Sequence, residues 1–407
     1  MSPSLKEMIR KVTELTRAGR LTEATAAIQR ALHAGNTAAP ERARMDEGRV
    51  FEMERAAVEM KAAVVDEPLR EKPAREKPAM REPAVAEPGQ SREAPVAEPE
   101  IVGRKKETGA FLKGRHTEVG LTREYMLFAP PGPFEKPPAL VVMLHGCTQD
   151  PADFARGTQM NRYALEQGFF VLYPAQAQDA NPMRCWNWFK TSDQGRAGEP
   201  AVITGMVREV LKEYGLDEER VYVAGLSAGG AMAAVLANAY PDVYAAAGVH
   251  SGLAPGAATN VMVALSVMKR GAAGPVAMPR VEGAAAKAAV PVIAFQGDAD
   301  DTVHARNGEQ LLEAVLKNTV KARALSAKEA AAPRVGEGMS DAGQRYTRSW
   351  YTNAQGQVMV EYWLLHGAGH AWAGGSPKGT YTDKSGPDAT EAMLRFFFTH
   401  RRGGAAS

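Results

Sequence analysis

Residues 222–233, YVAGLSAGGAMA, place one serine between an apolar run and a run of small residues. Ser227 lies in a Gly-x-Ser-x-Gly pattern, with Gly225 before it and Gly229 after it. Glycines at these positions let the backbone crowd without Cβ clashes, so a sharp strand-to-helix turn can present the hydroxyl to a base. The flanking sequence therefore predicts Ser227 as a nucleophile. The alternative is a small residue in a crowded turn.

Composition narrows the class of protein. The chain has 407 residues, of which 45% are hydrophobic, and a net charge of +2, which favours neither nucleic acid nor an anionic membrane as a partner. No run approaches the roughly 18 apolar residues of a membrane span, and the first residues lack the apolar core of a signal peptide. We therefore expect a cytoplasmic protein, with an extracellular location as the alternative.

Three regions differ in composition. Residues 1–40 carry two amphipathic patterns, which predict a helical hairpin that docks on a partner chain or on the rest of the protein. Residues 41–107 are rich in Pro, Glu and Arg, which predicts a disordered linker. From 108 to 402, apolar strands alternate with helices, which predicts a mostly parallel sheet covered by helices on both faces. The predicted strands are 139–146, 169–174, 220–225, 244–252, 290–297 and a pair within 348–365, and the predicted helices are 153–167, 201–215, 307–317 and 388–400.

An acidic cluster follows the strand predicted at 290–297. Asp298, Asp300 and Asp301 compete as the carboxylate that would orient a catalytic base. In hydrolases with a serine nucleophile, the acid often lies three residues after the glycine that ends the strand. That glycine is Gly297 here, which favours Asp300. The alternative is a cation site, although no further ligand set accompanies the cluster.

A glycine-rich segment, LLHGAGHAWAGG at 364–375, offers two histidines. His370 follows Gly-x-Gly on a late loop, where a base can reach both serine and leaving group, and it is therefore the predicted base. His366 and His370 would bind a metal if they shared a helix, but the glycines argue against a helix there, and no metal is expected. The order Ser227, Asp300, His370 is the chain order of α/β-hydrolases, so we predict that fold.

An oxyanion hole needs two backbone N–H groups from different loops. The N–H of Ala228, at the start of the helix after the serine, is one predicted donor. The second is the N–H of Cys147, which follows His145 in the stretch VVMLHGCTQ at 141–149. His145 itself is interpreted as a structural histidine that holds this loop.

Several blocks together resemble the polyhydroxybutyrate-depolymerase-type esterases, a family that also includes feruloyl and acetylxylan esterases. The blocks are LHGCTQDPADFA, YPAQ, CWNWF, GLSAGGAMA, GVHSG, QGDADDTVH and GHAWAGG. The resemblance covers about residues 108–400. It implies an α/β-hydrolase with Ser227 as nucleophile, His370 as base and Asp300 as acid, oxyanion donors at Cys147 and Ala228, and no cofactor.

The resemblance leaves three local questions open. Trp186 and Trp188 alternate around one asparagine, so one ring is expected at the substrate site, or both belong to the core. Cys147 and Cys185 lie in blocks that flank the same site, which implies a close pair and permits a disulfide. Residues 253–289 form an insertion that is either a lid or, as we favour, a flexible loop.

Two classes of function follow. The first is a serine esterase of the depolymerase type that acts on hydroxyalkanoate polyesters or oligomers, with acylated sugars as the alternative substrate. The second is a non-catalytic adaptor on polyester granules, docked through the helices of residues 1–40. The complete set of Ser227, Asp300 and His370 favours the enzyme.

Overall fold

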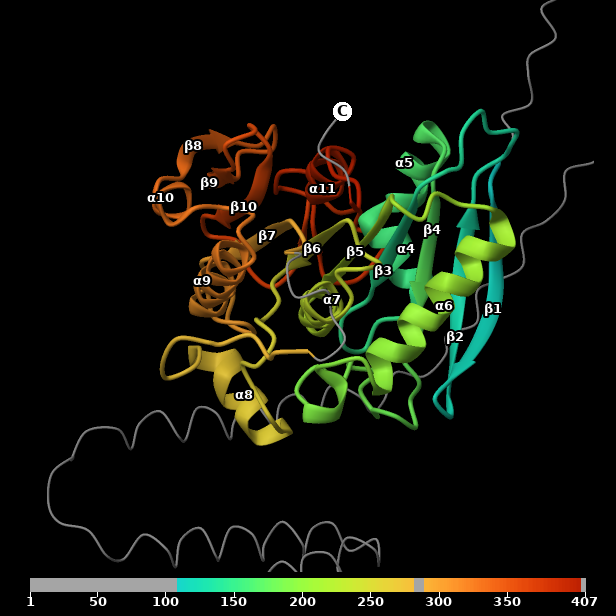
Figure 1. The fold of residues 1–407 in the computed structure, drawn as a ribbon, viewed down its shortest axis with the longest axis horizontal. Coiled ribbons are helices and arrows are strands. Elements are labelled where there is room, and N and C mark those ends of the chain that lie inside the picture. The colour runs from blue at the N-terminus through green and yellow to red at the C-terminus, as the bar shows by residue number, and fades with distance from the viewer. Residues whose placement is uncertain (1–107, 282–288, 404–407) are drawn as a thin grey trace, which may run out of the picture. The chain divides into compact units, whose positions relative to one another are not determined.

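A ten-stranded sheet organises the residues that this computed structural model describes, 108–281 and 289–403 (Figure 1). The strand order is β1-β2-β4-β3-β5-β6-β7-β10-β9-β8, and the six central strands run parallel. Antiparallel strands flank them on both sides. The predicted hairpin at 1–40 and linker at 41–107 lie outside the described residues. The strands are β1 (Ala110–Glu118), β2 (Leu121–Ala129), β3 (Leu140–Leu144), β4 (Phe170–Pro174), β5 (Val221–Leu226), β6 (Ala246–His250), β7 (Val292–Gly297), β8 (Arg334–Met339), β9 (Arg345–Thr352) and β10 (Val358–Leu365).

The central strands are buried along their whole length because helices cover both faces of the sheet. Every residue of β3, β4, β5, β6 and β7 is buried, which explains why these strands form continuous apolar runs in the sequence. One apolar core lies between the sheet and α6 (Gly198–Tyr214), α7 (Ala228–Ala239), α8 (Val261–Arg270) and α9 (Arg306–Lys321). The other lies between the opposite face and α4 (Pro151–Thr158), α5 (Met160–Gln167) and α11 (Ala389–Phe397). The predicted architecture is confirmed.

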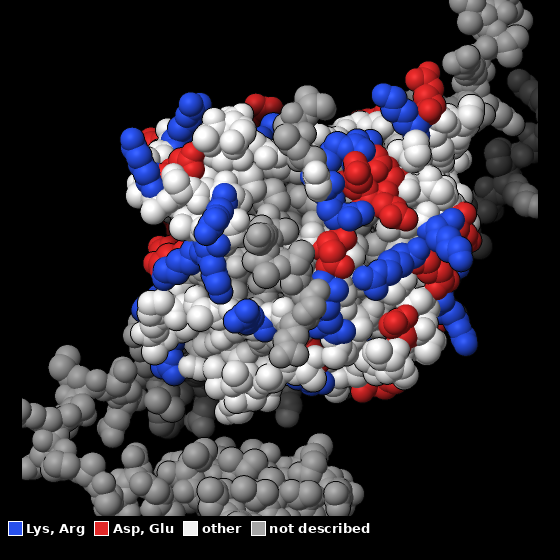
Figure 2. Space-filling view, viewed as in Figure 1, with Lys and Arg blue, Asp and Glu red and all other residues white. Residues whose placement is uncertain are grey.

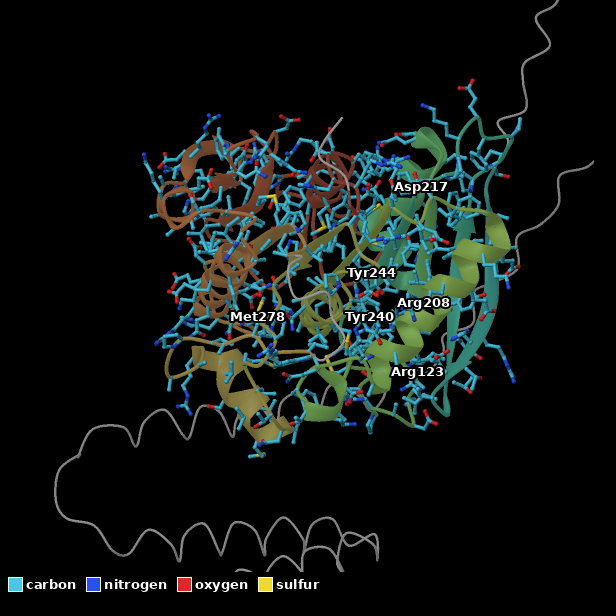
Figure 3. All side chains as sticks on the ribbon, viewed as in Figure 1. Arg123, Arg208, Asp217, Tyr240, Tyr244 and Met278 are labelled. Atoms are coloured by element: carbon cyan, nitrogen blue, oxygen red, sulfur yellow. A yellow bond between two sulfur atoms is a disulfide. The ribbon has the colours of Figure 1, made fainter. Side chains whose placement is uncertain are left out.

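Local sequence explains where these helices begin and end. The single helix predicted at 153–167 is two helices, because Gln159 adopts a left-handed conformation between α4 and α5. Asp150 caps α4 by accepting the backbone N–H of Asp153, and Gly215 ends α6 with φ 61°. The end of α7 also contacts α6: the Arg208 guanidinium of α6 lies 5.8 Å from the centre of the ring of Tyr240, the residue that ends α7 (Figure 3).

The insertion between β6 and β7 contains a helix, so a flexible loop is the wrong interpretation of its described part, up to residue 281. Helix α8 is held at its C-terminal end by the loop that follows β7 and by the first turn of α9. The His304 N–H donates to the Met268 carbonyl at 2.8 Å, and the Asn307 amide donates to the Val267 carbonyl at 3.0 Å. Whether α8 acts as a lid stays a prediction.

Charged side chains of both signs are interspersed over the face shown in Figure 2. Within residues 108–281 and 289–403, no helix has the length and apolar character that crossing a membrane requires.

Candidate active site

Ser227 occupies a strained turn between β5 and α7. Its backbone has φ 58° and ψ −119°, a conformation that residues with a side chain rarely adopt. The residue is the N-cap of α7, yet its side chain makes no capping bond. Its hydroxyl therefore stays available for chemistry, at the positive end of a helix dipole.

The two glycines around the serine are required by close backbone contacts. A Cβ atom on Gly229 would lie 2.0 Å from the carbonyl oxygen of Leu144 in the neighbouring strand β3. A Cβ on Gly225 would lie 2.4 Å from the backbone of Gly229. The glycine pattern thus lets helix α7 start directly against the end of β3, which brings Ser227 beside the loop that follows that strand.

Asp300 and His370 form a hydrogen-bonded pair. Asp300 Oδ2 accepts from His370 Nδ1 at 2.7 Å, and the two side chains are 0% and 9% exposed. The other oxygen of Asp300 accepts the N–H groups of Thr302 and Val303 at 2.9 and 2.7 Å. Burial alone raises the pKa of Asp300, but His370 and these N–H donors outweigh burial and lower the pKa below its usual value. A carboxylate held in this way fixes the imidazole with Nε2 free to accept a proton.

The other candidates in these loops pair differently. Asp298 Oδ2 accepts from His366 Nδ1 at 2.9 Å, whereas the Asp301 carboxylate contacts the Thr302 hydroxyl at 3.4 Å. The structure therefore pairs the predicted acid, Asp300, with the predicted base, His370, and pairs Asp298 with His366. The described residues contain no group of three or more His, Cys, Asp or Glu side chains suited to a metal ion.

His250 connects the nucleophile turn to the histidine segment. Its carbonyl accepts the Ser227 N–H at 2.9 Å, and its Nε2 accepts the Ala373 N–H at 3.1 Å. Burial, followed by the neighbouring His370, lowers the pKa of His250 to about 3, so this ring stays neutral and keeps its acceptor. Sequence reasoning gave no role to His250, although it lies in the GVHSG block. The described hydrogen bonds do not include one between Ser227 Oγ and His370 Nε2.

The loop after β3, residues 145–150, contains the predicted oxyanion donor and is called the oxyanion loop below. The Gly146 N–H donates to Gln149 Oε1 at 2.9 Å, and the Thr148 N–H donates to the Met183 carbonyl at 2.7 Å. Between them, the Cys147 N–H makes no hydrogen bond within the described residues. Ala228 is the first residue of α7, where backbone N–H groups have no partner inside the helix. Both predicted N–H groups are thus free for a ligand.

Gln149 shapes this loop, and sequence reasoning assigned it no function. The side chain is buried, and its amide nitrogen donates to Asp153 Oδ2 at 3.1 Å and to the Thr380 carbonyl at 3.0 Å. Thr380 belongs to the chain segment that follows His370. One glutamine therefore joins the oxyanion loop to helix α4 and to the histidine segment.

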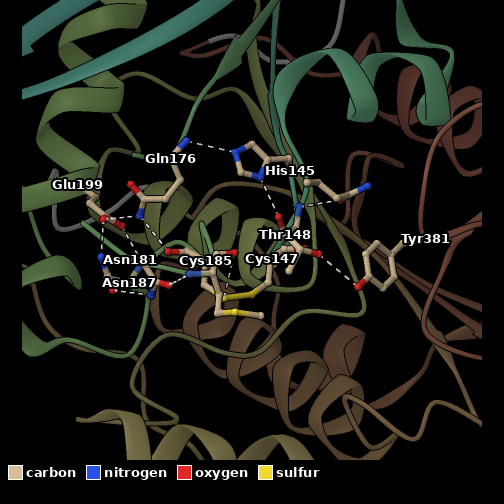
Figure 4. The surroundings of a disulfide bond; sticks show 12 residues. His145, Cys147, Thr148, Gln176, Asn181, Cys185, Asn187, Glu199 and Tyr381 are labelled. Atoms are coloured by element: carbon tan, nitrogen blue, oxygen red, sulfur yellow. Dashed lines mark hydrogen bonds between the residues drawn. A yellow bond between two sulfur atoms is a disulfide. The ribbon is translucent and has the colours of Figure 1, made fainter. Parts of the chain in front are cut away.

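Cys147 and Cys185 are joined by a disulfide bond (Figure 4). The bond ties the oxyanion loop to residues 183–185, and Tyr381 adds a contact from the other side through the Thr148 hydroxyl at 3.3 Å. Disulfides persist mainly in oxidising compartments. The location of the protein, cytoplasmic or extracellular, stays a prediction.

His145 has the structural role that its position predicted. Its Nδ1 donates to the Gly146 carbonyl at 2.7 Å, and its Nε2 accepts the Gln176 N–H at 3.2 Å. Burial lowers the pKa of His145 to about 4, so the ring is neutral and both nitrogens serve the loop. Gln176 in turn donates to the buried carboxylate of Glu199 at 2.6 Å (Figure 4).

The two tryptophans belong to the core. Trp186 is 0% exposed and Trp188 is 4% exposed, and both pack in the cluster beneath α6 and α7. Neither ring presents a face to solvent, so the expectation that one of them binds substrate is corrected in favour of the core alternative. Their alternation around Asn187 does not place one ring outside, because this segment is a loop folded into the interior rather than a strand with one wet face.

A cavity of about 760 Å³ is lined in part by His145, Gln149 and Asp150 of the loop after β3. Apolar and polar side chains both line it, and neither Ser227 nor His370 is among them. Its lining includes Lys113, Arg115, Glu124, Gln149, Asp150 and Arg184.

A strained serine between strand and helix, in a parallel sheet covered on both faces, defines the α/β-hydrolase class. The chain shares this fold with an acetyl xylan esterase from Aspergillus awamori, with a TM-score of 0.55, 18% identity, and coverage of 70% of this chain and 99% of that chain. The chain belongs to the family described as esterase PHB depolymerase, whose sequence profile matches residues 123–337.

Curated relatives cover part of the chain. A poly(3-hydroxyalkanoate) depolymerase C from Paucimonas lemoignei is 39% identical over 133 residues, which are 32% of this chain and 32% of that protein. A feruloyl esterase B from Thermothelomyces thermophilus is 36% identical over 132 residues, 32% of this chain and 44% of that protein. The chain thus spans less than half the length of these relatives.

Proposed function

We propose that the protein is a serine esterase that cleaves carboxylic esters through an acyl-enzyme. Ser227 Oγ attacks the ester carbonyl while His370 Nε2 takes its proton, and Asp300 stabilises the imidazolium that forms. The N–H groups of Cys147 and Ala228 hold the oxyanion. The alcohol leaves with the proton from His370, and water, activated by the same nitrogen, then releases the acid.

The observation that carries this proposal is the buried Asp300–His370 hydrogen bond of 2.7 Å on the same sheet edge as the strained Ser227. A structural ion pair has no need for a serine with φ 58° nearby, and a crowded turn has no need for an oriented histidine. His250 accepts the N–H groups of Ser227 and Ala373, and these two contacts hold the serine turn against the segment that carries His370. The apo hydrogen bond between serine and base is commonly long and tightens when substrate binds.

For the substrate class, we propose hydroxyalkanoate esters, either oligomers or polymer. Support comes from membership of the depolymerase family and from the similarity to the Paucimonas lemoignei depolymerase. Feruloyl- or acetyl-decorated sugars are the second candidate, supported by the similarity to feruloyl esterase B.

Hydrolysis of p-nitrophenyl acetate and butyrate by the full chain, beside Ser227→Ala, tests the chemistry. The wild type is expected to hydrolyse both esters, and the variant to lose at least about 10³-fold in kcat. Activity that survives Ser227→Ala, or a wild type without activity, would refute the nucleophile. A panel of 3-hydroxybutyrate oligomers, methyl ferulate and acetylated xylan then separates the two substrate classes by their kcat/KM values.

A further inference from the structure

A second aspartate–histidine pair lies beside the first. Asp298 Oδ2 accepts from His366 Nδ1 at 2.9 Å, and His366 Nε2 lies 2.8 Å from the Thr347 hydroxyl on β9. Because Nδ1 donates to the carboxylate, Nε2 of a neutral imidazole accepts the threonine proton. Both ring nitrogens are thus engaged, and the imidazole is fixed in one orientation. Neither residue reaches Ser227 through any described hydrogen bond, so the esterase chemistry does not use them directly.

The pair joins the two loops that carry Asp300 and His370. Asp298 precedes Asp300 by two residues, and His366 precedes His370 by four. The second oxygen of Asp298 accepts the Gly367 N–H at 2.6 Å, and its own N–H donates to the Leu365 carbonyl at 3.1 Å. One side chain therefore holds both the start of the acid loop and the start of the histidine loop.

These loops are also pressed together by their backbones. The Ala299 N–H donates to the Ala368 carbonyl at 3.1 Å, and a Cβ on Gly297 would lie 2.2 Å from that same oxygen. These backbone contacts continue the register of β7 and β10 into the two loops. The Asp298–His366–Thr347 chain adds a side-chain restraint on both loops, because it ends on β9, the strand next to β10.

We infer that Asp298 and His366 are positioning residues that hold Asp300 and His370 in register for catalysis. The inference rests on the proposed function, because it assigns the pair to the same triad. A displacement of about 1 Å within a catalytic constellation can cost about 10²-fold in rate.

A purely stabilising role would have a different signature. Both side chains are 37% exposed, and ion pairs at such partly exposed sites contribute little to folding. Their effect on kcat is therefore expected to exceed their effect on thermal unfolding. The pKa of Asp298 is raised by burial and lowered more strongly by the Gly367 N–H and His366, which indicates that the carboxylate form is the one held between the loops.

The experiment measures kcat and KM with p-nitrophenyl acetate for the full chain and for Asp298→Ala, Asp298→Asn and His366→Asn. Asp298→Ala is expected to lower kcat at least tenfold, with KM within twofold and the melting temperature within a few degrees. Asp298→Asn retains an acceptor for the Gly367 N–H and is expected to recover part of the loss. Asp301→Ala, which removes a neighbouring carboxylate that contacts Thr302, serves as the matched control and is expected to keep wild-type kcat.

A double-mutant cycle with Asp300→Ala separates positioning from an independent effect. If Asp298 acts through the Asp300–His370 pair, adding Asp298→Ala to Asp300→Ala lowers the single-turnover rate by less than twofold. The same tenfold loss in both backgrounds, or wild-type kcat in both Asp298→Ala and His366→Asn, would overturn the inference. Either result leaves the proposed function standing, because that depends on Ser227→Ala; if Asp298→Ala does not fold, His366→Asn carries the same cycle.

Discussion

Replacing Gln149 with alanine is expected to lower kcat, because this side chain determines which N–H group of the oxyanion loop is free. The side-chain oxygen of Gln149 accepts a hydrogen bond from the Gly146 N–H at 2.9 Å, while the Cys147 N–H has no partner among the described residues. Its amide nitrogen reaches Asp153 and Thr380. Without Gln149, the Gly146 N–H is released, and the loop loses the bond from this side chain to Thr380 in the segment that follows His370.

The contacts set the size of both effects. Three hydrogen-bonded partners are lost, at a net contribution of about 1 kcal/mol each, so the free energy of unfolding is expected to fall by about 3 kcal/mol. Removal of a whole oxyanion donor costs about 10²- to 10³-fold in kcat. Because the Cys147 N–H remains but loses its fixed position, the expected loss in kcat is smaller, between about tenfold and 10²-fold, with KM little changed.

Steady-state hydrolysis of p-nitrophenyl butyrate and urea unfolding would be measured on the same preparations. Gln310→Ala is the matched control, since this buried glutamine also accepts one N–H, from Ala272, and donates to two carbonyls, of Ala272 and Gly274. It is expected to lose similar stability but to keep kcat. Equal kcat values for Gln149→Ala and Gln310→Ala would refute the link between Gln149 and the oxyanion hole.

Three further predictions concern stability. Reduction of the disulfide at Cys147 releases a loop of 38 residues and is expected to lower the free energy of unfolding by about 4 kcal/mol, measured by urea unfolding with and without dithiothreitol; no shift in the midpoint would contradict it. The free energy of unfolding is expected to fall as pH drops from 6.5 to 4, because three histidines whose pKa is lowered by burial bind protons in the unfolded chain but not in the folded chain. The expected loss is about 1.4 kcal/mol per pH unit for each histidine. A melting temperature that does not change over this pH range would exclude the prediction. These histidines are His145, His250 and His400. Gly229→Ala would place a Cβ 2.0 Å from the Leu144 carbonyl and is expected to destabilise by at least about 3 kcal/mol, whereas Gly195→Ala, which has open space around it, is expected to leave the melting temperature within about 2 °C.

Interpretation of the sequence was most successful where structure is local. Strand β5, the turn at Ser227 and helix α7 are consecutive, and the need for Gly225 and Gly229 follows from backbone crowding within that turn and against the adjacent strand. The continuous apolar runs of β3 to β7 likewise predicted strands buried on both faces. Element type was therefore readable, although the left-handed residue Gln159 divided one predicted helix and α8 replaced a predicted loop.

Pairing between distant loops was a matter for the tertiary structure. The sequence favoured Asp300 and His370 among three aspartates and two histidines by their place in the motifs, whereas the fold shows the contacts themselves: Asp300 meets His370 across 70 positions and Asp298 meets His366 across 68. The tertiary structure likewise decided the burial of Trp186 and Trp188, because a loop that is not part of a sheet can turn two alternating rings inward.

The sequence by itself determined the architecture, the turn at Ser227 and the order of the candidate catalytic motifs, because periodicity and backbone sterics act over a few residues. The tertiary structure decided which carboxylate orients which imidazole, that Gln149 leaves the Cys147 N–H free, and that His250 links the serine to the histidine segment. Those choices depend on hydrogen bonds between loops that meet only when the parallel strands align their carboxyl ends at one edge of the sheet.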